Sequence, residues 1–298
     1  MTETRSWPTD PVTGDSAKEF ADKIGLPEEY FTAAEPLMPK IHELIKDKPF
    51  DEDLWDSDNL SEISKSIGAE HDLTNLAAGI LIGMRAHAFY QEHGIGDDIY
   101  YPSMREITVW SKTCANVIGH LGLHEWGWVT CFFTAGIVRL GRLEFHEVDF
   151  HDTFTWEKNG FTVKGGDKVI NTHIPEDGPL DPDAVIDSFR RAYRYFKKTG
   201  PAAFVCASWL LWPGNYEFLA PNSRIRAFMD NFDIISHDDS KNNWDLWRVF
   251  GFRDSYDPAT LPRETDLQRR MADFLAKNDN VTGSGYGVFL FDGENIVR

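Results

Sequence analysis

Paired cysteines, an excess of positive charge and long hydrophobic runs are all missing from this chain of 298 residues. Its three cysteines (Cys114, Cys131 and Cys206) are widely spaced and form no CxxC pair, so we expect reduced, structural thiols. A net charge of −18 disfavours binding to nucleic acid or to an anionic membrane surface. The longest apolar run, Ala77–Met84, is far too short to span a bilayer, and the polar start does not look like a secretory signal. The sequence therefore predicts a cytoplasmic protein without nucleic-acid or membrane partners.

Motifs that would identify a nucleotide-binding or metal-dependent enzyme are missing as well: there is no Walker loop, no GxGxxG after a strand, no GxSxG and no HExxH. Acidic and histidine residues cluster in Glu144–Asp152, but successive strand residues face opposite sides of a sheet, so the cluster cannot converge on one ion. His120 and His124 are separated by Gly122 near an expected helix end, which makes a helical ligand pair unreliable. No metal cofactor is expected, and a metal-dependent hydrolase is kept as a third hypothesis.

Apolar side chains are abundant, with 42% hydrophobic and 13% aromatic residues, and they can fill a large packed core. Up to about residue 121 they recur at helical spacing, and no alternating pattern interrupts them. Segments 27–46, 74–93 and 102–120 are expected to be helices, the second with Thr74 as its N-cap and Gly94 at its end. The first part of the chain therefore predicts an all-helical domain, residues 1–125.

Strand patterns follow the helical part, and turn residues separate them. The expected elements are a long strand over 137–150, a hairpin turning at Asn159-Gly160, strands over 169–174 and 202–211, helical segments over 216–232 and 266–277, and a final strand over 285–292. Their order predicts an antiparallel meander that leads into a βαβ unit. Residues 126–298 are thus expected to form a mixed α/β domain, which makes the whole chain an α+β protein.

The most informative segment is Val169–Phe196, where a strand ends and a well-marked helix begins. Pro175 denies the strand a further hydrogen-bond donor, and the following residues are typical of a turn. Asp181 is expected to cap a helix that starts with Pro182. Unpaired amides and the helix dipole at such a start attract anions. The unit is therefore a candidate phosphate site, although most strand–loop–helix units only connect elements.

Several groups of residues, taken in order, carry a resemblance that covers most of the chain beyond about Gly94. They are Arg139–Phe145 (RLGRLEF), Asn171–Pro175 with Gly178–Leu180 and Ser188, Ser208–Leu211, and Leu261, Pro262, Thr265, Leu267 and Gln268. As a set they resemble a bacterial family of acyltransferases with an N-acyltransferase N-terminal domain and a GNAT-like C-terminal domain. The resemblance implies two domains, and acyl transfer from acyl-coenzyme A or acetyl-coenzyme A to a small amine.

One loop departs from the pattern that the resemblance implies. GNAT enzymes carry a glycine-rich pyrophosphate loop after their fourth strand, but residues 173–180 (HIPEDGPL) hold one glycine, two prolines and two acids. Prolines remove amide donors and acids repel phosphate. Coenzyme A would therefore rely on the backbone of Ile174, Gly178, Leu180 and Asp181. The alternative hypothesis is a degenerate GNAT fold that binds a ligand or partner without catalysis.

Candidate catalytic side chains follow from the strand pattern and the resemblance together. Glu144, Arg142 and His146 share one face of the expected strand over 137–150 because side chains alternate. Amine acylation needs a base to remove a proton from the attacking ammonium, and we expect Glu144 or His173 to serve. For both, the alternative is a structural role, such as fixing the following loop by His173.

The remaining candidates are contacts to substrate or cofactor. Arg142, His146 and Trp209 are candidate substrate contacts, with a structural network or core packing as the alternative. Asn215 and Tyr216, just beyond the strand over 202–211, are candidates for contacts to the pantetheine arm of coenzyme A.

Overall fold

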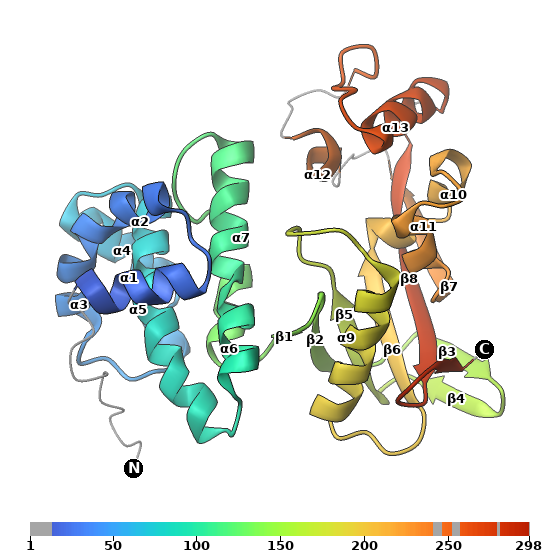
Figure 1. The fold of residues 1–298 in the computed structure, drawn as a ribbon, viewed down its shortest axis with the longest axis horizontal. Coiled ribbons are helices and arrows are strands. Elements are labelled where there is room, and N and C mark those ends of the chain that lie inside the picture. The colour runs from blue at the N-terminus through green and yellow to red at the C-terminus, as the bar shows by residue number, and fades with distance from the viewer. Residues whose placement is uncertain (1–13, 241–245, 252–256, 279–280, 298) are drawn as a thin grey trace. The chain divides into compact units, whose positions relative to one another are not determined.

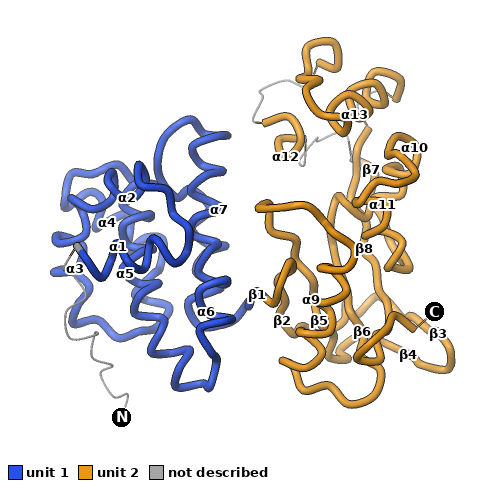
Figure 2. Tube along the Cα trace, viewed as in Figure 1, with its two compact units in different colours: residues 1–139 blue, residues 140–298 orange. Residues whose placement is uncertain are grey.

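The computed structural model describes residues 14–240, 246–251, 257–278 and 281–297, and the chain divides into two compact units, residues 1–139 and 140–298 (Figures 1 and 2). The division falls later than the expected boundary at residue 125. The reason is helix α8 (Trp126–Phe133), whose Val129, Phe132 and Phe133 are buried in the core of the first unit. Among the described residues, no helix is both long and apolar enough to cross a membrane.

The first unit packs short helices around one long, buried helix, α5. Its elements are α1 (Gly14–Lys23), α2 (Glu28–Ala34), η1 (Glu35–Leu37), α3 (Met38–Ile45), η2 (Glu52–Leu54), α4 (Ser57–Ile67), α5 (His71–Glu92), α6 (Asp97–Met104), α7 (Glu106–Thr113), the π-helical turn η3 (Cys114–Ile118) and α8. Leu76, Ile80 and Leu81 of α5 are fully buried. A helix that is apolar on several sides must lie at the centre of its domain, so the expectation of an all-helical domain is confirmed.

Two helix boundaries differ from the expected ones. Helix α5 begins at His71 because the Glu70 carboxylate accepts a 2.8 Å hydrogen bond from the Leu73 amide, so Glu70 and not Thr74 is the N-cap. The expected helix over 102–120 is divided into the end of α6, α7 and η3. It ends where Gly119 takes a left-handed backbone conformation with φ of 94°, which glycine adopts without steric cost.

The second unit is built on a mixed sheet of order β1-β2-β5-β6-β8-β7, whose first strand begins just before the division at residue 139, with β9 paired to β8 and a separate hairpin β3–β4. Its elements are β1 (Val138–Leu140), β2 (Leu143–Asp149), β3 (Thr155–Lys158), β4 (Phe161–Lys164), β5 (Lys168–His173), α9 (Pro182–Tyr195), β6 (Ala202–Ser208), η4 (Trp209–Leu211), α10 (Asn215–Phe218), α11 (Arg224–Met229), β7 (Asp233–Ser240), α12 (Leu246–Phe250), α13 (Asp266–Lys277), β8 (Thr282–Phe291) and β9 (Ile296–Val297). Strands β5 and β6 are parallel and joined by α9, so the expected βαβ unit is confirmed.

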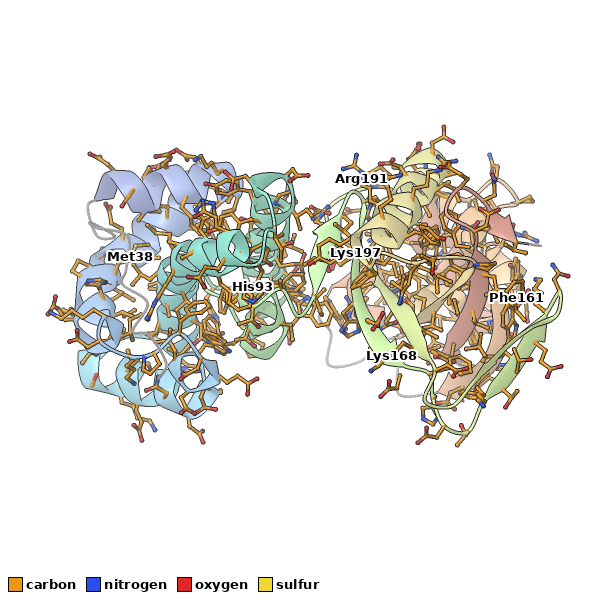
Figure 3. All side chains as sticks on the ribbon, turned by 90° about the horizontal axis from the view of Figure 1, so that it is seen from below. Met38, His93, Phe161, Lys168, Arg191 and Lys197 are labelled. Atoms are coloured by element: carbon orange, nitrogen blue, oxygen red, sulfur yellow. The ribbon has the colours of Figure 1, made fainter. Side chains whose placement is uncertain are left out.

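The two faces of this sheet are covered in different ways. Helix α9 lies across one face (Figure 1), where its Phe189 meets Phe145 and Phe204 with ring centroids 6.1 and 5.3 Å apart. The hairpin β3–β4 packs Trp156 and Val163 on the opposite face. The expected turn at Asn159-Gly160 forms this hairpin, and the exposed Phe161 directly follows the turn as the first residue of β4 (Figure 3). The hairpin's contacts lie at the end of that face near Val169, Val205 and Val288.

Several strands differ from the expected pattern. The long strand over 137–150 is broken, because Gly141 takes a φ of 82° and Arg142 lies in the turn. Strand β7 was not expected. Strand β8 starts earlier than residue 285, with glycines that allow close packing: a Cβ on Gly285 would lie 2.1 Å from the carbonyl oxygen of Leu211. The expected strand over 202–211 ends at Ser208 and continues as η4.

Candidate active site

A polar cluster lies on the sheet face opposite α9, formed by neighbouring strands β2 and β5. The antiparallel register sets Glu144 opposite His173 and His146 opposite Asn171, and alternation puts all four side chains on one face. The Nε2 atoms of His146 and His173 lie 3.3 Å apart, and the Asn171 amide nitrogen lies 2.9 and 3.3 Å from them. Two imidazoles and an amide therefore converge at one point.

Burial favours the neutral form of both histidines. Burial lowers the pKa of His173 to about 4, with a smaller contribution from neighbouring His146. Burial also lowers the pKa of His146. Placed with its nitrogen toward the rings, the Asn171 amide donates to His146 Nε2, which leaves the proton of that ring on Nδ1. A neutral imidazole with an accepting nitrogen is a proton acceptor, so the pair has the chemistry of a general base.

Glu144 and Arg142 are expected on one face of the same strand, but only Glu144 lies in the strand. Glu144 is buried with 1% of its surface exposed, on the same face as the histidine pair. Arg142 lies in the turn before β2, and its guanidinium donates to the carbonyls of Pro179 (2.9 Å) and Gly178 (2.5 Å). Its backbone amide donates to Ser188 Oγ at 2.8 Å. Arg142 thus joins the turn, the loop after β5 and helix α9.

The sheet opens next to the histidine pair. The parallel ladder between β5 and β6 pairs Ile170 with Phe204 and Asn171 with Val205. Beyond these pairs, β5 continues to His173 and β6 to Ser208, and no further β5–β6 register pair follows among the described residues. Ala207, on the same face as His173, is exposed although its strand is central in the sheet.

Tyr286 of β8 lies on the other side of Ala207, opposite it in register. Its ring stacks on Phe154, with centroids 5.6 Å apart. Burial raises the pKa of Tyr286 to about 12, with a smaller effect from Cys206, so the phenol keeps its proton. The open part of this face is therefore bounded by a proton acceptor on one side and a hydroxyl donor on the other.

The loop after β5 has the turn that the sequence predicts, but the carboxylate at its end is already engaged. Asp181 caps α9 as expected and accepts from the amides of Asp183 (3.2 Å) and Ala184 (3.4 Å). Gly178 is exposed, and the nearest atom to an added Cβ would be Arg142 Nε at 4.0 Å. The loop therefore has room for a ligand beside Gly178, while a carboxylate occupies the helix start.

Cations of α9 lie apart from the helix start. Arg191 pairs with Asp187 one turn earlier, at 2.6 Å, and Figure 3 shows Arg191 on α9 and Lys197 in the turn that follows it. Arg190 pairs with Glu294 at 3.2 Å. The side chains of Arg190 and Arg191 are therefore engaged in ion pairs, and as cations they complement the C-terminal half of the helix.

The segment after β6 holds the three remaining candidates. Asn215 is buried and donates to the carbonyl of Trp209 at 2.8 Å, so it fixes the turn η4. Tyr216 donates to Asp230 at 2.6 Å, and burial and this carboxylate raise its pKa to about 12. Neither is joined by a hydrogen bond to the histidine cluster in the described residues. Trp209 is half-buried at the end of β6.

Sequence reasoning missed Asn171, Ala207 and Tyr286 as parts of this site. Asn171 belongs to the Asn171–Pro175 motif, and the signal that identifies it is its spacing of two residues from His173, which places both side chains on one strand face. Ala207 and Tyr286 gave no sequence signal of their own, because their relation to His173 depends on the pairing of β6 with β5 and β8.

Comparison with known proteins gives two family matches and a set of solved structures. Residues 137–289 match a family described as the GNAT-like C-terminal domain, and residues 15–135 match the N-acyltransferase N-terminal domain. An acyltransferase in complex with decanoyl-CoA and teicoplanin is 19% identical, with a TM-score of 0.73 over 94% of this chain and 90% of that one. A variant acyltransferase in complex with octanoyl-CoA is 18% identical, with the same TM-score and coverage. No curated protein matches the sequence.

Proposed function

Because this chain belongs to the family whose members join an N-acyltransferase N-terminal domain to a GNAT-like C-terminal domain, we propose that it transfers an acyl group from an acyl-coenzyme A to a small amine. The observation that carries the proposal is the neutral His146–His173 pair on an open sheet face, beside the point where β5 and β6 separate. Family membership alone supports a fold and a reaction class; the pair supplies a group that this reaction needs.

The reaction is direct attack. The amine nitrogen bonds to the thioester carbon, the carbon–sulfur bond breaks, and coenzyme A leaves as a thiolate that takes up a proton. His173 accepts the proton that the attacking ammonium must lose, since burial keeps this imidazole neutral. His146 and Asn171 hold the His173 ring, and Glu144 opposite His173 can stabilise the imidazolium that forms or act as the base itself.

The acyl-coenzyme A would bind along the ends of β5 and β6 and the loop from Ile174 to Leu180. The exposed surface at Gly178 and the open strand ends support this placement. The capped start of α9 favours contacts to phosphate from loop amides and not from the amides of Asp183 and Ala184. Tyr286, which keeps its proton, would donate a hydrogen bond to the departing thiolate, and the thiolate takes up the second proton that the amine nitrogen loses.

The test is release of coenzyme A from acetyl-, octanoyl- and decanoyl-coenzyme A with a panel of amines that includes teicoplanin, the ligand of one solved relative. His173→Gln should lower kcat by about 10²- to 10⁴-fold, the range for loss of a general acid or base. His151→Gln is the matched control, because His151 is exposed in the same unit. Full rates in both His173→Gln and Glu144→Gln would refute the catalytic assignment.

A non-catalytic binding protein is the second candidate, and the occupied helix start at Asp181 favours it. Calorimetric titration with acyl-coenzyme A thioesters separates the two. Micromolar binding that a bulky residue at Gly178 abolishes supports the acyltransferase. Absence of binding to every thioester, in a folded protein, supports a fold that has lost its co-substrate.

A further inference from the structure

A second cluster of ionisable side chains lies in the helical unit, outside the candidate active site. The Asp72 carboxylate, in the first turn of α5, is almost completely buried, with 9% of its side chain exposed. One of its oxygens, Oδ2, lies 2.9 Å from His120 Nε2 and 3.0 Å from His124 Nδ1. Cys114 Sγ lies 4.0 Å from the same oxygen. Three further potential metal ligands therefore surround this carboxylate oxygen.

The backbone is shaped to bring these groups together. Cys114 begins the π-helical turn η3, a rare conformation that often marks functional sites. The chain then turns at Gly119 and passes directly over Asp72 at Gly122, where a Cβ would lie 2.7 Å from Asp72 Cβ. The Leu123 amide donates to the Asp72 carbonyl at 2.8 Å. A side chain at Gly122 would push the segment that carries both histidines away from the carboxylate.

We propose that Asp72, Cys114 and His120 bind a zinc-like divalent cation, with His124 at its solvent-facing side. The three ligand atoms lie within 4.8 Å of one another, which a cation at typical zinc–ligand distances of about 2.0–2.3 Å can bridge after small side-chain movements. His120 and His124 also show the three-residue spacing of histidine pairs in structural zinc sites.

The chemistry of the donors selects the class of metal. One sulfur, one or two imidazole nitrogens and one carboxylate oxygen are typical ligands of zinc and poor ligands for magnesium or calcium, which prefer oxygen. A bound thiolate and carboxylate together balance a double positive charge. Binding releases the thiol proton of Cys114 and any proton on the coordinating nitrogen of His120.

The role that follows is structural. The cation would tie the first turn of α5 to η3 and to the segment 119–125, elements that are far apart in sequence. Because the ligands lie in the helical unit, this proposal is independent of the acyl-transfer function.

The test uses the full-length protein after removal of metal by a chelator. Titration with Co²⁺ should give a tetrahedral cobalt spectrum with a thiolate-to-metal charge-transfer band, which one equivalent of Zn²⁺ then abolishes. Loss of a residue that only hydrogen-bonds to a metal ligand weakens metal binding by about 10- to 100-fold, so loss of a direct ligand in Cys114→Ser or His120→Asn should weaken it by about 100-fold or more. His124→Asn should have a smaller effect.

Two matched controls belong to the same unit. Cys131→Ser removes the exposed cysteine, and His87→Asn removes a histidine that contacts Asp97 at 2.7 Å. Both should bind the metal as the wild type does. The wild-type spectrum requires no variant to fold: if cobalt binds without a thiolate band, or does not bind at micromolar concentration, the cluster is a hydrogen-bonded network and the proposal is wrong.

Discussion

Acidification should destabilise the second unit through His173, and the size of this effect follows from its surroundings. Burial and His146 lower the pKa of His173 from 6.5 to about 4. The unfolded chain then binds more protons than the folded one between these values, so this contribution to stability is complete above 6.5 and is lost as the pH falls toward 4. For one such group, the linkage relation gives a loss of about 2 kcal/mol between about pH 7 and about pH 5. His146 acts in the same direction.

Urea unfolding of the wild type and of His173→Gln, followed by tryptophan fluorescence across this pH range, measures the effect. Glutamine does not titrate, so the free energy of unfolding of the variant should fall by about 2 kcal/mol less than that of the wild type. His151→Gln, at an exposed position, should follow the wild type. Parallel pH dependences for wild type and His173→Gln would refute the reasoning, because they would mean that His173 is not held neutral by the fold.

Three further predictions concern the same unit. Replacing Arg142 with methionine removes the hydrogen bonds to Gly178 and Pro179, and each such bond from a charged donor contributes about 1.5–3 kcal/mol. Amide hydrogen exchange in residues 174–180 should therefore accelerate, and the affinity for acyl-coenzyme A should fall. Unchanged exchange would show that the loop conformation does not depend on Arg142. Gly285→Ala should lower the free energy of unfolding by about 1–3 kcal/mol, because the added methyl group would collide with the Leu211 carbonyl. Gly127→Ala is the control and should not destabilise the protein, because no neighbouring group of the described residues lies within 4 Å of the added methyl. The rate of acyl transfer should rise with pH through the low pKa of His173 and then stay level toward neutrality, since the base must be unprotonated. A fall in rate on acidification with a midpoint near pH 6.5 would contradict the role of His173 as the base.

Local patterns predicted those parts of the fold that depend on local chemistry. Asn159-Gly160 specifies a hairpin turn by itself, and Asp181 with Pro182 specifies a helix start, so both were predicted correctly. The strand over 137–150 was wrong at Gly141, because an apolar alternation can continue across a glycine in sequence while the backbone turns there.

Features that depend on distant pairing could not be predicted from local patterns. Strand β7, with its acidic end, is a strand because β8 pairs with it. The approach of His120 to Asp72, 48 residues earlier in the chain, depends on how the segment 119–125 closes over α5. In the candidate site, His146 and His173 were named from sequence, but their meeting at 3.3 Å depends on the register of β2 and β5.

Ala207 is a position at which the size of the accepted ligand can be engineered. Its exposed methyl group lies beside Tyr286 on the sheet face that carries His173, and Phe204 of the same strand packs against Phe189 of α9 on the other face. Residues of increasing volume at this position would reduce the space above this face of the sheet stepwise, without contacting the aromatic core on the other face. A series from glycine through serine to valine would therefore measure the size of the groups that the protein accepts, and each single substitution would change its selectivity for ligand size.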